Sequence, residues 1–472
     1  MVDESVSYKP LYLQVKDVIL QRILDDEYRK GATIPSEASM AQELGTSIST
    51  VRQALALLAE EGVLTKKQGK GTFVTEQTTT LSFLTWLPET KRGAEILAAT
   101  LALLHEKQPA LQVQCLPTTR ETAQRDLLQR IASGCAPDLA QIQASWTGFF
   151  AAMGALERLE PLLAPENLAQ RFYDKDLWGG MYRNAVYSAA WGLSPVALLA
   201  NKVMLRYAEL EIGAQPMTLA ALQTLCKRLE KRWGRWPKYS YGFSLTTGGA
   251  ADFFSLAPLF QAFQGGIMNA RGELIFDSAE NIAALRWLRH FVQTRRVLIA
   301  DPVTLRQRFA KHEIALIAAS PSVKYLLEEE TGEAFAAHFQ VVLNPVLPRF
   351  QTLAWNDNTA LAICAQSRHK LYAAHVIDAL TQDEIISHYY YTQTGALPVA
   401  KTRLPDAPEQ TEFWHLYQTQ LASATCLNAQ HERFGQALTF CLDAVKRILF
   451  EGVDIETELH EKTRSLQLLL AA

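Results

Sequence analysis

A group of cationic side chains near the N-terminus has the composition of a phosphate-binding surface. Residues 62–74 contain Lys66, Lys67 and Lys70 and no acid, a local charge of +3, whereas the 61 residues before them carry six basic and ten acidic residues, a local −4. Lysines contact the phosphates of nucleic acids, and Arg52 could fork onto a guanine or clamp a phosphate. The whole chain carries a formal charge of only −3, so a surface for nucleic acid must be local.

The elements expected around these residues are short helices and a hairpin. Apolar residues at helical spacing predict a first helix after Pro10, Ser36 predicts the cap of a second helix that Gly45 ends, and a third helix ends at Gly62. The stretch "VLTKKQGKGTFV" then predicts two strands around a glycine turn. Two helices joined by the short turn "TSIS" and followed by a basic hairpin make a winged helix-turn-helix, with Thr50 and Arg52 in the first turn of the recognition helix.

Residues 8–76 also resemble the GntR-family DNA-binding domain. The resemblance lies in "IPSEASMAQELGTSISTVRQALALLAEEGVLTKKQGKGTFV", with its Pro-Ser-Glu opening, T-V-R-x-A-L helix and G-x-G-T-F-V wing. Two usual family arginines are replaced by Ala38 and Ile48, so the target sequence cannot be carried over. A winged helix used only for protein contacts or dimerisation is the alternative. The residues expected to contact DNA, or to shape that surface, are Ser36, Glu37, Ser49, Thr50, Arg52, Lys66, Lys67, Lys70 and Gly71.

The rest of the chain alternates strand-like and helix-like segments. After a polar linker, Thr75–Thr80, the strand "LSFLTWL", the helix "AEILAATLALLHEK", the strand "LQVQCLPT", the helix "TAQRDLLQRIASG" and the strand "PDLAQIQA" follow in order. Such alternation predicts a mainly parallel α/β sheet.

Residues 81–472 resemble the family 1 extracellular solute-binding proteins. The matching pieces include "APDLAQIQASWTGFFAAMGALERLEPLL", "WGLSPVALLANKVML", "YGFSLTTGG", "FAKHEIALIAASPS" and "ALPVAK". His312 replaces a usual glycine, and "TLAWNDNTALAI" replaces a glycine-rich crossover. The resemblance implies a two-lobed α/β periplasmic-binding-protein type II fold behind the α+β winged helix, with a ligand in the cleft. The expected bounds are 1–74 for the winged helix, 75–80 for the linker, about 81–195 plus 355–400 for lobe 1 and about 196–352 plus 401–472 for lobe 2.

Aromatic and polar residues at predicted strand ends are the candidates for that ligand site. Open α/β sheets place ligands at the carboxyl ends of their strands, and flat indole rings suit the C–H faces of sugars. The family position also points to the loop after "IALIAA". The expected ligand residues are Trp86, Glu89, Ser145, Trp146, Ser320, Ser322, Trp355, Asn356 and Asp357.

The composition and motifs argue against several other classes of protein. The six cysteines are scattered without a C-x-x-C pair, and no basic n-region, long apolar span, G-x-S-x-G, H-E-x-x-H or Walker motif occurs. We therefore expect a cytoplasmic, non-enzymatic protein without a cofactor, a metal or a membrane segment. Its expected partners are an operator in double-stranded DNA, a small effector of carbohydrate type and a second copy of the chain.

Three alternatives remain at this point. One is a pyridoxal-phosphate-binding, aminotransferase-like second domain, which GntR-type regulators of this length also carry, although no Ser-x-x-Lys segment stands beside a glycine-rich phosphate loop. A second is a transport-associated binding protein, and a third is a regulator whose cleft no longer binds a ligand.

Overall fold

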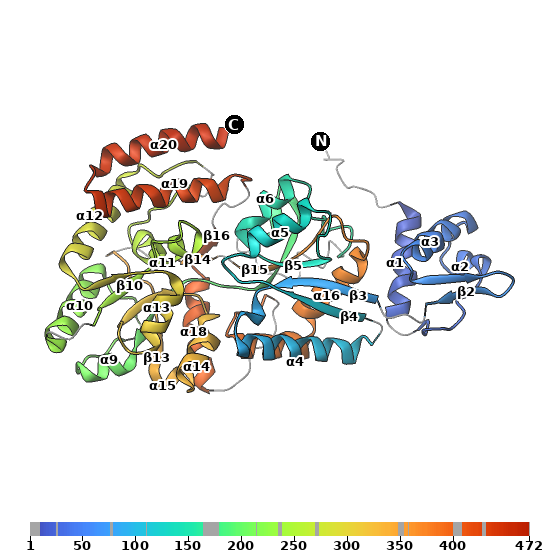
Figure 1. The fold of residues 1–472 in the computed structure, drawn as a ribbon, viewed down its shortest axis with the longest axis horizontal. Helices are drawn as coiled ribbons and strands as arrows, with labels where there is room; N and C mark the ends of the chain where they lie inside the picture. The colour runs from blue at the N-terminus through green and yellow to red at the C-terminus, as the bar shows by residue number, and fades with distance from the viewer. Residues whose placement is uncertain are drawn as a thin grey trace.

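The structure, a computed structural model, arranges the chain as an elongated molecule. The winged helix lies at one end, next to a first α/β body, and a second α/β body lies beyond it (Figure 1). The structure describes residues 10–24, 27–75, 79–109, 111–163, 179–213, 215–234, 238–269, 273–347, 354–356, 358–399, 408–426 and 431–471.

The winged helix follows its expected element order. The hydroxyl of Ser36 accepts a hydrogen bond from the Ser39 amide (3.2 Å) and begins α2, and that of Ser47 accepts from the Thr50 amide (3.1 Å) and begins α3. The recognition helix therefore starts at Ile48, inside the stretch that was expected to be a turn. The elements are α1 Leu11–Leu24, α2 Glu37–Glu43, α3 Ile48–Glu60, β1 Leu64–Lys67 and β2 Gly71–Val74.

The buried apolar side chains of the winged helix belong to a network that continues through the first α/β body and into the second. Val15 and Ile19 of α1 belong to the same buried cluster as Leu81 and Leu111 of the neighbouring sheet. The Lys30 ammonium also donates to the Pro109 carbonyl at 3.4 Å. The DNA-binding module is thus packed against the sheet and not only tethered to it.

The first sheet has the strand order β4-β3-β5-β15-β8. Its strands β3, β4 and β5 are parallel, as expected, but β15 runs antiparallel to both β5 and β8. The expected mainly parallel sheet is therefore mixed, because β15 enters it from the other body instead of through a local helical crossover. The elements are β3 Thr79–Thr85, η1 Leu87–Glu89, α4 Lys91–Lys107, β4 Leu111–Pro117, α5 Ala123–Ala132, β5 Leu139–Gln143, η2 Ala144–Trp146, α6 Thr147–Ala152, β6 Met181–Tyr182, β7 Ala185–Val186, β8 Ser188–Gly192, β15 Thr359–Ile363, α16 Lys370–Gln382 and α17 Glu384–Thr394.

The second sheet has the order β11-β10-β12-β9-β13. Strands β10, β11 and β12 are parallel, whereas β9 is antiparallel to β12 and β13. The elements are β9 Ala197–Asn201, α9 Lys202–Tyr207, α10 Leu219–Trp233, β10 Tyr241–Phe243, α11 Ala250–Gln261, α12 Ala279–Thr294, β11 Val297–Ile299, α13 Pro302–Ala310, β12 Leu316–Ala319, α14 Val323–Thr331, α15 Phe335–His338 and β13 Phe339–Val342.

Two chain crossings between the sheets meet in a buried polar cluster. Residues 193–196 lead from β8 to β9, and the chain returns between β13 and β15. The Asn358 side chain accepts from the Ser194 amide at 3.1 Å, and the Asn344 side chain donates to the Val196 carbonyl at 2.8 Å. Both asparagines are almost fully buried, so these bonds join the two crossings where they pass each other.

The C-terminal part of the chain returns to both bodies. Helix α19 packs against α11 of the second body and contacts α6 and η2 of the first, and it runs beside α20 in Figure 1. The remaining elements are β14 Ala354–Asn356, α18 Pro408–Leu421, β16 Ala424–Cys426, α19 Phe434–Lys446, η3 Arg447–Glu451 and α20 Ile455–Ala471.

The start of β3 differs from the sequence expectation, and the backbone at His312 explains a departure from the family pattern. Thr79 and Thr80, which were placed in the linker, form the start of β3 and pair with Leu111 and Gln112 of β4. Threonine is β-branched and suits a strand, although the polar composition suggested a loop. His312, at the position where the solute-binding family usually has glycine, has a φ of 57°. That left-handed conformation is the one that glycine adopts without strain.

Candidate functional site

The start of the recognition helix is held by a network of hydroxyl groups. The Ser47 hydroxyl lies 2.8 Å from that of Ser49 and 2.7 Å from that of Thr50. All three residues precede or occupy the first turn of α3, the part of such a helix that enters the major groove. Ala38 and Ile48, which stand where the family usually has arginine, are both exposed on the same domain.

A carboxylate organises the two cations nearest to this turn. Glu37 Oε2 accepts from Arg52 Nε at 2.8 Å, and Glu37 Oε1 lies 3.4 Å from Lys66 Nζ. Burial alone would raise the pKa of Glu37, but the hydrogen bonds from Arg52 and Lys66 outweigh it and hold the pKa below its ordinary value. The Arg52 side chain remains 62% exposed, so it is positioned and still accessible.

The wing presents two more cations on a turn that needs glycine. Lys67 Nζ lies 4.6 Å from the centre of the Phe73 ring, and Lys70 is exposed at the tip. Gly69 and Gly71 have φ angles of 73° and 106°, which side chains other than hydrogen rarely allow. The predicted DNA residues therefore lie on one small domain, at the starts of its second and third helices and on its wing.

Two of the predicted ligand residues, Trp86 and Trp146, are in direct contact. Their ring centres are 6.0 Å apart with an edge-on geometry. Trp86 is only 2% exposed, and the Arg120 guanidinium lies 5.4 Å from its ring centre. Trp146 is half-buried at the end of η2. In this conformation Trp146 offers more surface for a sugar ring than Trp86 does.

Glu89 lies at the end of η1, three residues after Trp86, and two of the predicted serines lie just before α14. Glu89 is exposed, and its Oε2 accepts from the Arg120 amide at 3.1 Å. The hydroxyls of Ser320 and Ser322 lie 3.0 Å apart just before α14, which carries Tyr325. Ser145 is half-buried beside Trp146.

The last three predicted ligand residues can be placed only by their backbone. Trp355 and Asn356 belong to β14, which pairs in parallel with β16, so that Trp355 lies opposite Thr425. Strand β14 contacts α11 of the second body. Asp357 lies outside the described residues.

The structure adds three residues that the sequence expectations missed. Arg120 follows β4, Tyr325 lies on α14 and Tyr390 lies on α17. The signal for Arg120 was its place just beyond the carboxyl end of a predicted strand, whereas the two tyrosines lie on helices and gave no such signal. We call Trp86, Glu89, Arg120, Trp146, Tyr325 and Tyr390 the interlobe cluster.

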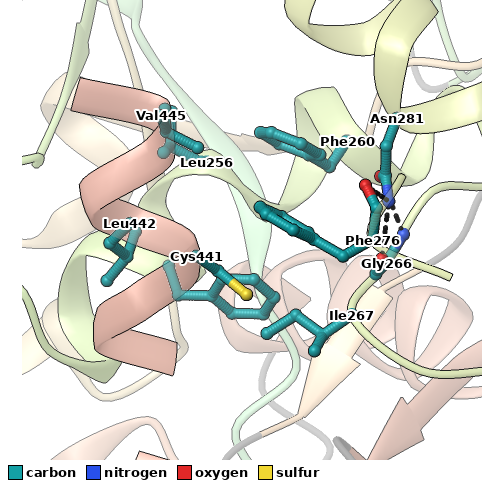
Figure 2. A pocket seen from close by; sticks show the side chains of 10 residues that line it. Leu256, Phe260, Gly266, Ile267, Phe276, Asn281, Cys441, Leu442 and Val445 are labelled. Atoms are coloured by element: carbon teal, nitrogen blue, oxygen red, sulfur yellow. Dashed lines mark hydrogen bonds between the residues drawn. The ribbon is translucent and has the colours of Figure 1, made fainter. Parts of the chain in front are cut away.

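A separate cavity inside the second body is too small and too apolar for a sugar. Figure 2 shows Phe260, Phe276 and Cys441 on its wall, with the Asn281 amide bonded to the Gly266 carbonyl at 2.7 Å. Its volume is about 10 Å³, which is roughly the space that one water molecule requires. It is a packing defect and not a candidate ligand site.

Within the described residues, no helix combines the length and the apolar character that crossing a membrane requires.

The N-terminal residues 11–74 match the model of bacterial regulatory proteins of the gntR family. Two curated relatives are the mannosyl-D-glycerate transport/metabolism system repressor MngR of Escherichia coli, 42% identical over 72 residues, and the repressor NagR of Bacillus subtilis, 39% identical over 67 residues. These alignments cover 15% and 14% of this chain and only 30% and 28% of the relatives.

Residues 103–415 match the model of bacterial extracellular solute-binding proteins. The fold resembles a solute-binding protein of Thermotoga lettingae bound with α-D-tagatose (TM-score 0.71, 20% identity, 83% of this chain and 100% of the other) and the GacH receptor of Streptomyces glaucescens (TM-score 0.71, 13% identity, 84% and 99%). The alternative prediction of an aminotransferase-like second domain is therefore wrong. The chain belongs to the bacterial extracellular solute-binding protein family, and it carries a GntR-family helix-turn-helix domain ahead of the solute-binding fold.

Proposed function

We propose that this protein is a transcriptional regulator whose binding to operator DNA is controlled by a small ligand, a sugar or oligosaccharide, held between the two lobes. The observation that carries the proposal is the contact of the winged helix with the first body, through a continuous network of buried apolar side chains and the hydrogen bond from Lys30 to the Pro109 carbonyl. It joins a module of DNA-binding type directly to a lobe of solute-binding type, so a movement of that lobe also moves the recognition helix.

The DNA-binding half of the proposal rests on the charged surface of the winged helix. Arg52 is accessible at the first turn of α3, and Lys66, Lys67 and Lys70 line the wing beside it. In a winged helix, this turn reads base edges while the wing contacts phosphates. The sequence-related repressors support this role for the domain.

The ligand-binding half rests on the fold and on the residues at the strand ends. Trp146 is half-buried and contacts Trp86, and polar residues occur on η1 directly after Trp86 and on the loop before α14. Structures with this fold are described in complex with α-D-tagatose, acarbose and cycloalternan. A carbohydrate is therefore the ligand class that we propose for the cleft.

We propose that lobe closure couples the two halves. The hinge would lie near residues 193–200 and 353–362, where the asparagine cluster joins the crossings between the sheets. The lobes would follow the bounds expected from the sequence, and a homodimer would place two recognition helices on one operator. A modest rotation of the lobes would then change the separation of these helices, and DNA tolerates little error in that spacing.

The direct test is a thermal-shift screen of the full chain against mono- and oligosaccharides, since a cleft ligand stabilises the folded state by mass action. Each compound that raises the melting temperature is then added to a complex with labelled operator DNA, and fluorescence anisotropy is measured. We expect at least one saccharide to do both. A saccharide that binds without any effect on operator affinity would contradict ligand control, and a complete absence of saccharide binding would support an emptied cleft.

A further inference from the structure

We propose that the interlobe cluster binds an oxyanion, so that the natural ligand is an acidic saccharide carrying a carboxylate or a phosphate. This inference rests on the proposed function, because it names the class of ligand that the cleft would take. Arg120, Tyr325 and Tyr390 carry it, and they come from a loop and two helices that are far apart in the sequence.

Arg120 is a cation held in place without an acidic partner. Its guanidinium lies 5.4 Å from the centre of the Trp86 ring, and its backbone amide donates to Glu89 at 3.1 Å. Within the part of the chain that the structure describes, Arg120 makes no ion pair. Most arginines of this protein that flank the region do: Arg92 pairs with Glu328 at 3.1 Å and Arg306 with Glu330 at 2.8 Å.

Two tyrosines lie on helices that pack near this cation. Glu328, three positions after Tyr325 on α14, pairs with Arg92 at the start of α4, and α14 contacts α17, which carries Tyr390. Tyr325 is 6% exposed and Tyr390 is 4% exposed, and neither hydroxyl bonds to any group among the described residues. Both hydroxyl oxygens therefore keep some exposure to solvent, since neither belongs to the fully buried polar atoms without a hydrogen bond. Nearly buried phenols whose hydroxyls still reach solvent donate to water, and a ligand oxygen that displaces this water would accept the same hydrogen bonds.

The packing around the two tyrosines fixes their positions. The Tyr390 ring stacks on Trp191 at 4.2 Å between ring centres, with 7° between the planes. Helix α14, which carries Tyr325, begins against the end of α17: a Cβ on Gly395 would lie 2.8 Å from the Pro321 carbonyl. The stack on Trp191 holds the Tyr390 ring, and the close approach of Pro321 to Gly395 fixes the start of α14 against the end of α17.

The chemistry of these groups suits an anion. Burial raises the pKa of Tyr325 and of Tyr390, and the nearby Arg120 acts in the opposite direction on both. Both phenols are therefore neutral O–H donors at physiological pH. One guanidinium with two O–H donors supplies the charge-assisted hydrogen bonds that carboxylates and phosphates accept. The negative charge of Glu89 also raises the pKa of Tyr325 and would repel an anion, so replacing Glu89 should strengthen anion binding.

The first experiment uses sulfate as the probe, with chloride at equal ionic strength as the reference. We expect sulfate to raise the melting temperature of the full chain and to change its tryptophan fluorescence in a saturable way. Arg120→Gln should weaken sulfate binding roughly 10- to 100-fold, and Glu89→Gln should strengthen it. The matched control is Arg125→Gln, which removes an exposed arginine of the same lobe and should leave sulfate binding unchanged.

Two conservative substitutions distinguish an effect on anion binding from an effect on folding. Tyr325→Phe and Tyr390→Phe should weaken sulfate binding severalfold, yet leave the melting temperature without sulfate unchanged, because neither hydroxyl has a bond to lose within the protein. A sulfate response no larger than that to chloride, or one that Arg120→Gln leaves intact, would overturn the inference.

The second experiment identifies the source of the oxyanion by comparing glucose, glucuronate and glucose 6-phosphate, and galactose with galacturonate. Stronger binding of the uronates indicates a carboxylate, and stronger binding of the sugar phosphate indicates a phosphate. Neutral sugars that bind more tightly than their acidic counterparts would refute the inference and leave the proposed function standing. If no saccharide of either kind binds, the proposed ligand class fails, and the sulfate result alone decides whether the oxyanion site exists.

Discussion

Replacing Arg52 with alanine should separate sequence recognition from the stability of the winged helix. The guanidinium is 62% exposed and pairs with Glu37, whose side chain is 26% exposed. Such exposed pairs contribute about 0.2–1 kcal/mol. We therefore expect the free energy of unfolding to fall by less than about 1 kcal/mol.

The effect on DNA binding should be larger than the effect on stability. If Arg52 holds a guanine with both arms of its guanidinium, the variant should lose ~1–3 kcal/mol of specific binding, roughly a 5- to 150-fold weaker affinity. The loss should vanish on DNA in which that base pair is exchanged. Glu37 must release Arg52, or turn with it, when the base is engaged.

The assay is fluorescence anisotropy of the full chain with operator DNA and with a scrambled duplex, at several salt concentrations. Lys70→Ala is the matched control, because we expect the lysine at the wing tip to contact phosphate and no base. It should weaken binding to both duplexes equally and reduce the slope of log affinity against log salt by about 1. An unchanged preference for the operator in Arg52→Ala would show that Arg52 is only a phosphate clamp and would refute this reasoning.

Three further results are expected. Calorimetry with a bound saccharide should show weaker binding for Trp146→Ala and for Trp355→Ala, and unchanged affinity in both would remove these residues from the site. Footprinting should reveal two related half-sites on the operator, as a homodimer requires, and a single unrepeated site would count against the dimer. Burial and the neighbouring His338 lower the pKa of His312 below 6.5, so the unfolded chain binds the extra proton first. Thermal unfolding should therefore show stability lost as the pH falls below about 6.5, and less of this loss in His312→Asn, whose asparagine tolerates the positive φ.

Local signals in the sequence were enough to predict the winged helix in detail. Ser36 caps its helix, Gly62 has a φ of 75° just after α3, and Gly69 and Gly71 form the turn of the wing. Each of these features depends on neighbours within a few residues, so composition and spacing predict it. The two-lobed fold was predicted from a resemblance spread over many short segments.

The parts that sequence reasoning missed depend on contacts between distant segments. Trp86 was predicted as a ligand residue, but its contact with Arg120, 34 positions further along the chain, was not predicted. The antiparallel direction of β15 follows from its arrival from the other body, which no local pattern encodes. Tyr325 and Tyr390 lie on α14 and α17, which are far apart in the sequence and contact each other in the fold.

The central claim, that ligand and DNA control each other through this chain, is tested most directly by titrating a saccharide that binds with and without saturating operator DNA. Linkage requires that the operator change saccharide affinity by the same factor by which the saccharide changes operator affinity, and a coupling of ~1–3 kcal/mol would be usual. The account predicts two titration curves displaced by that factor, with the saccharide bound more weakly on DNA if it relieves repression. Superimposable curves would show that the two domains are joined but not coupled, and would contradict the account.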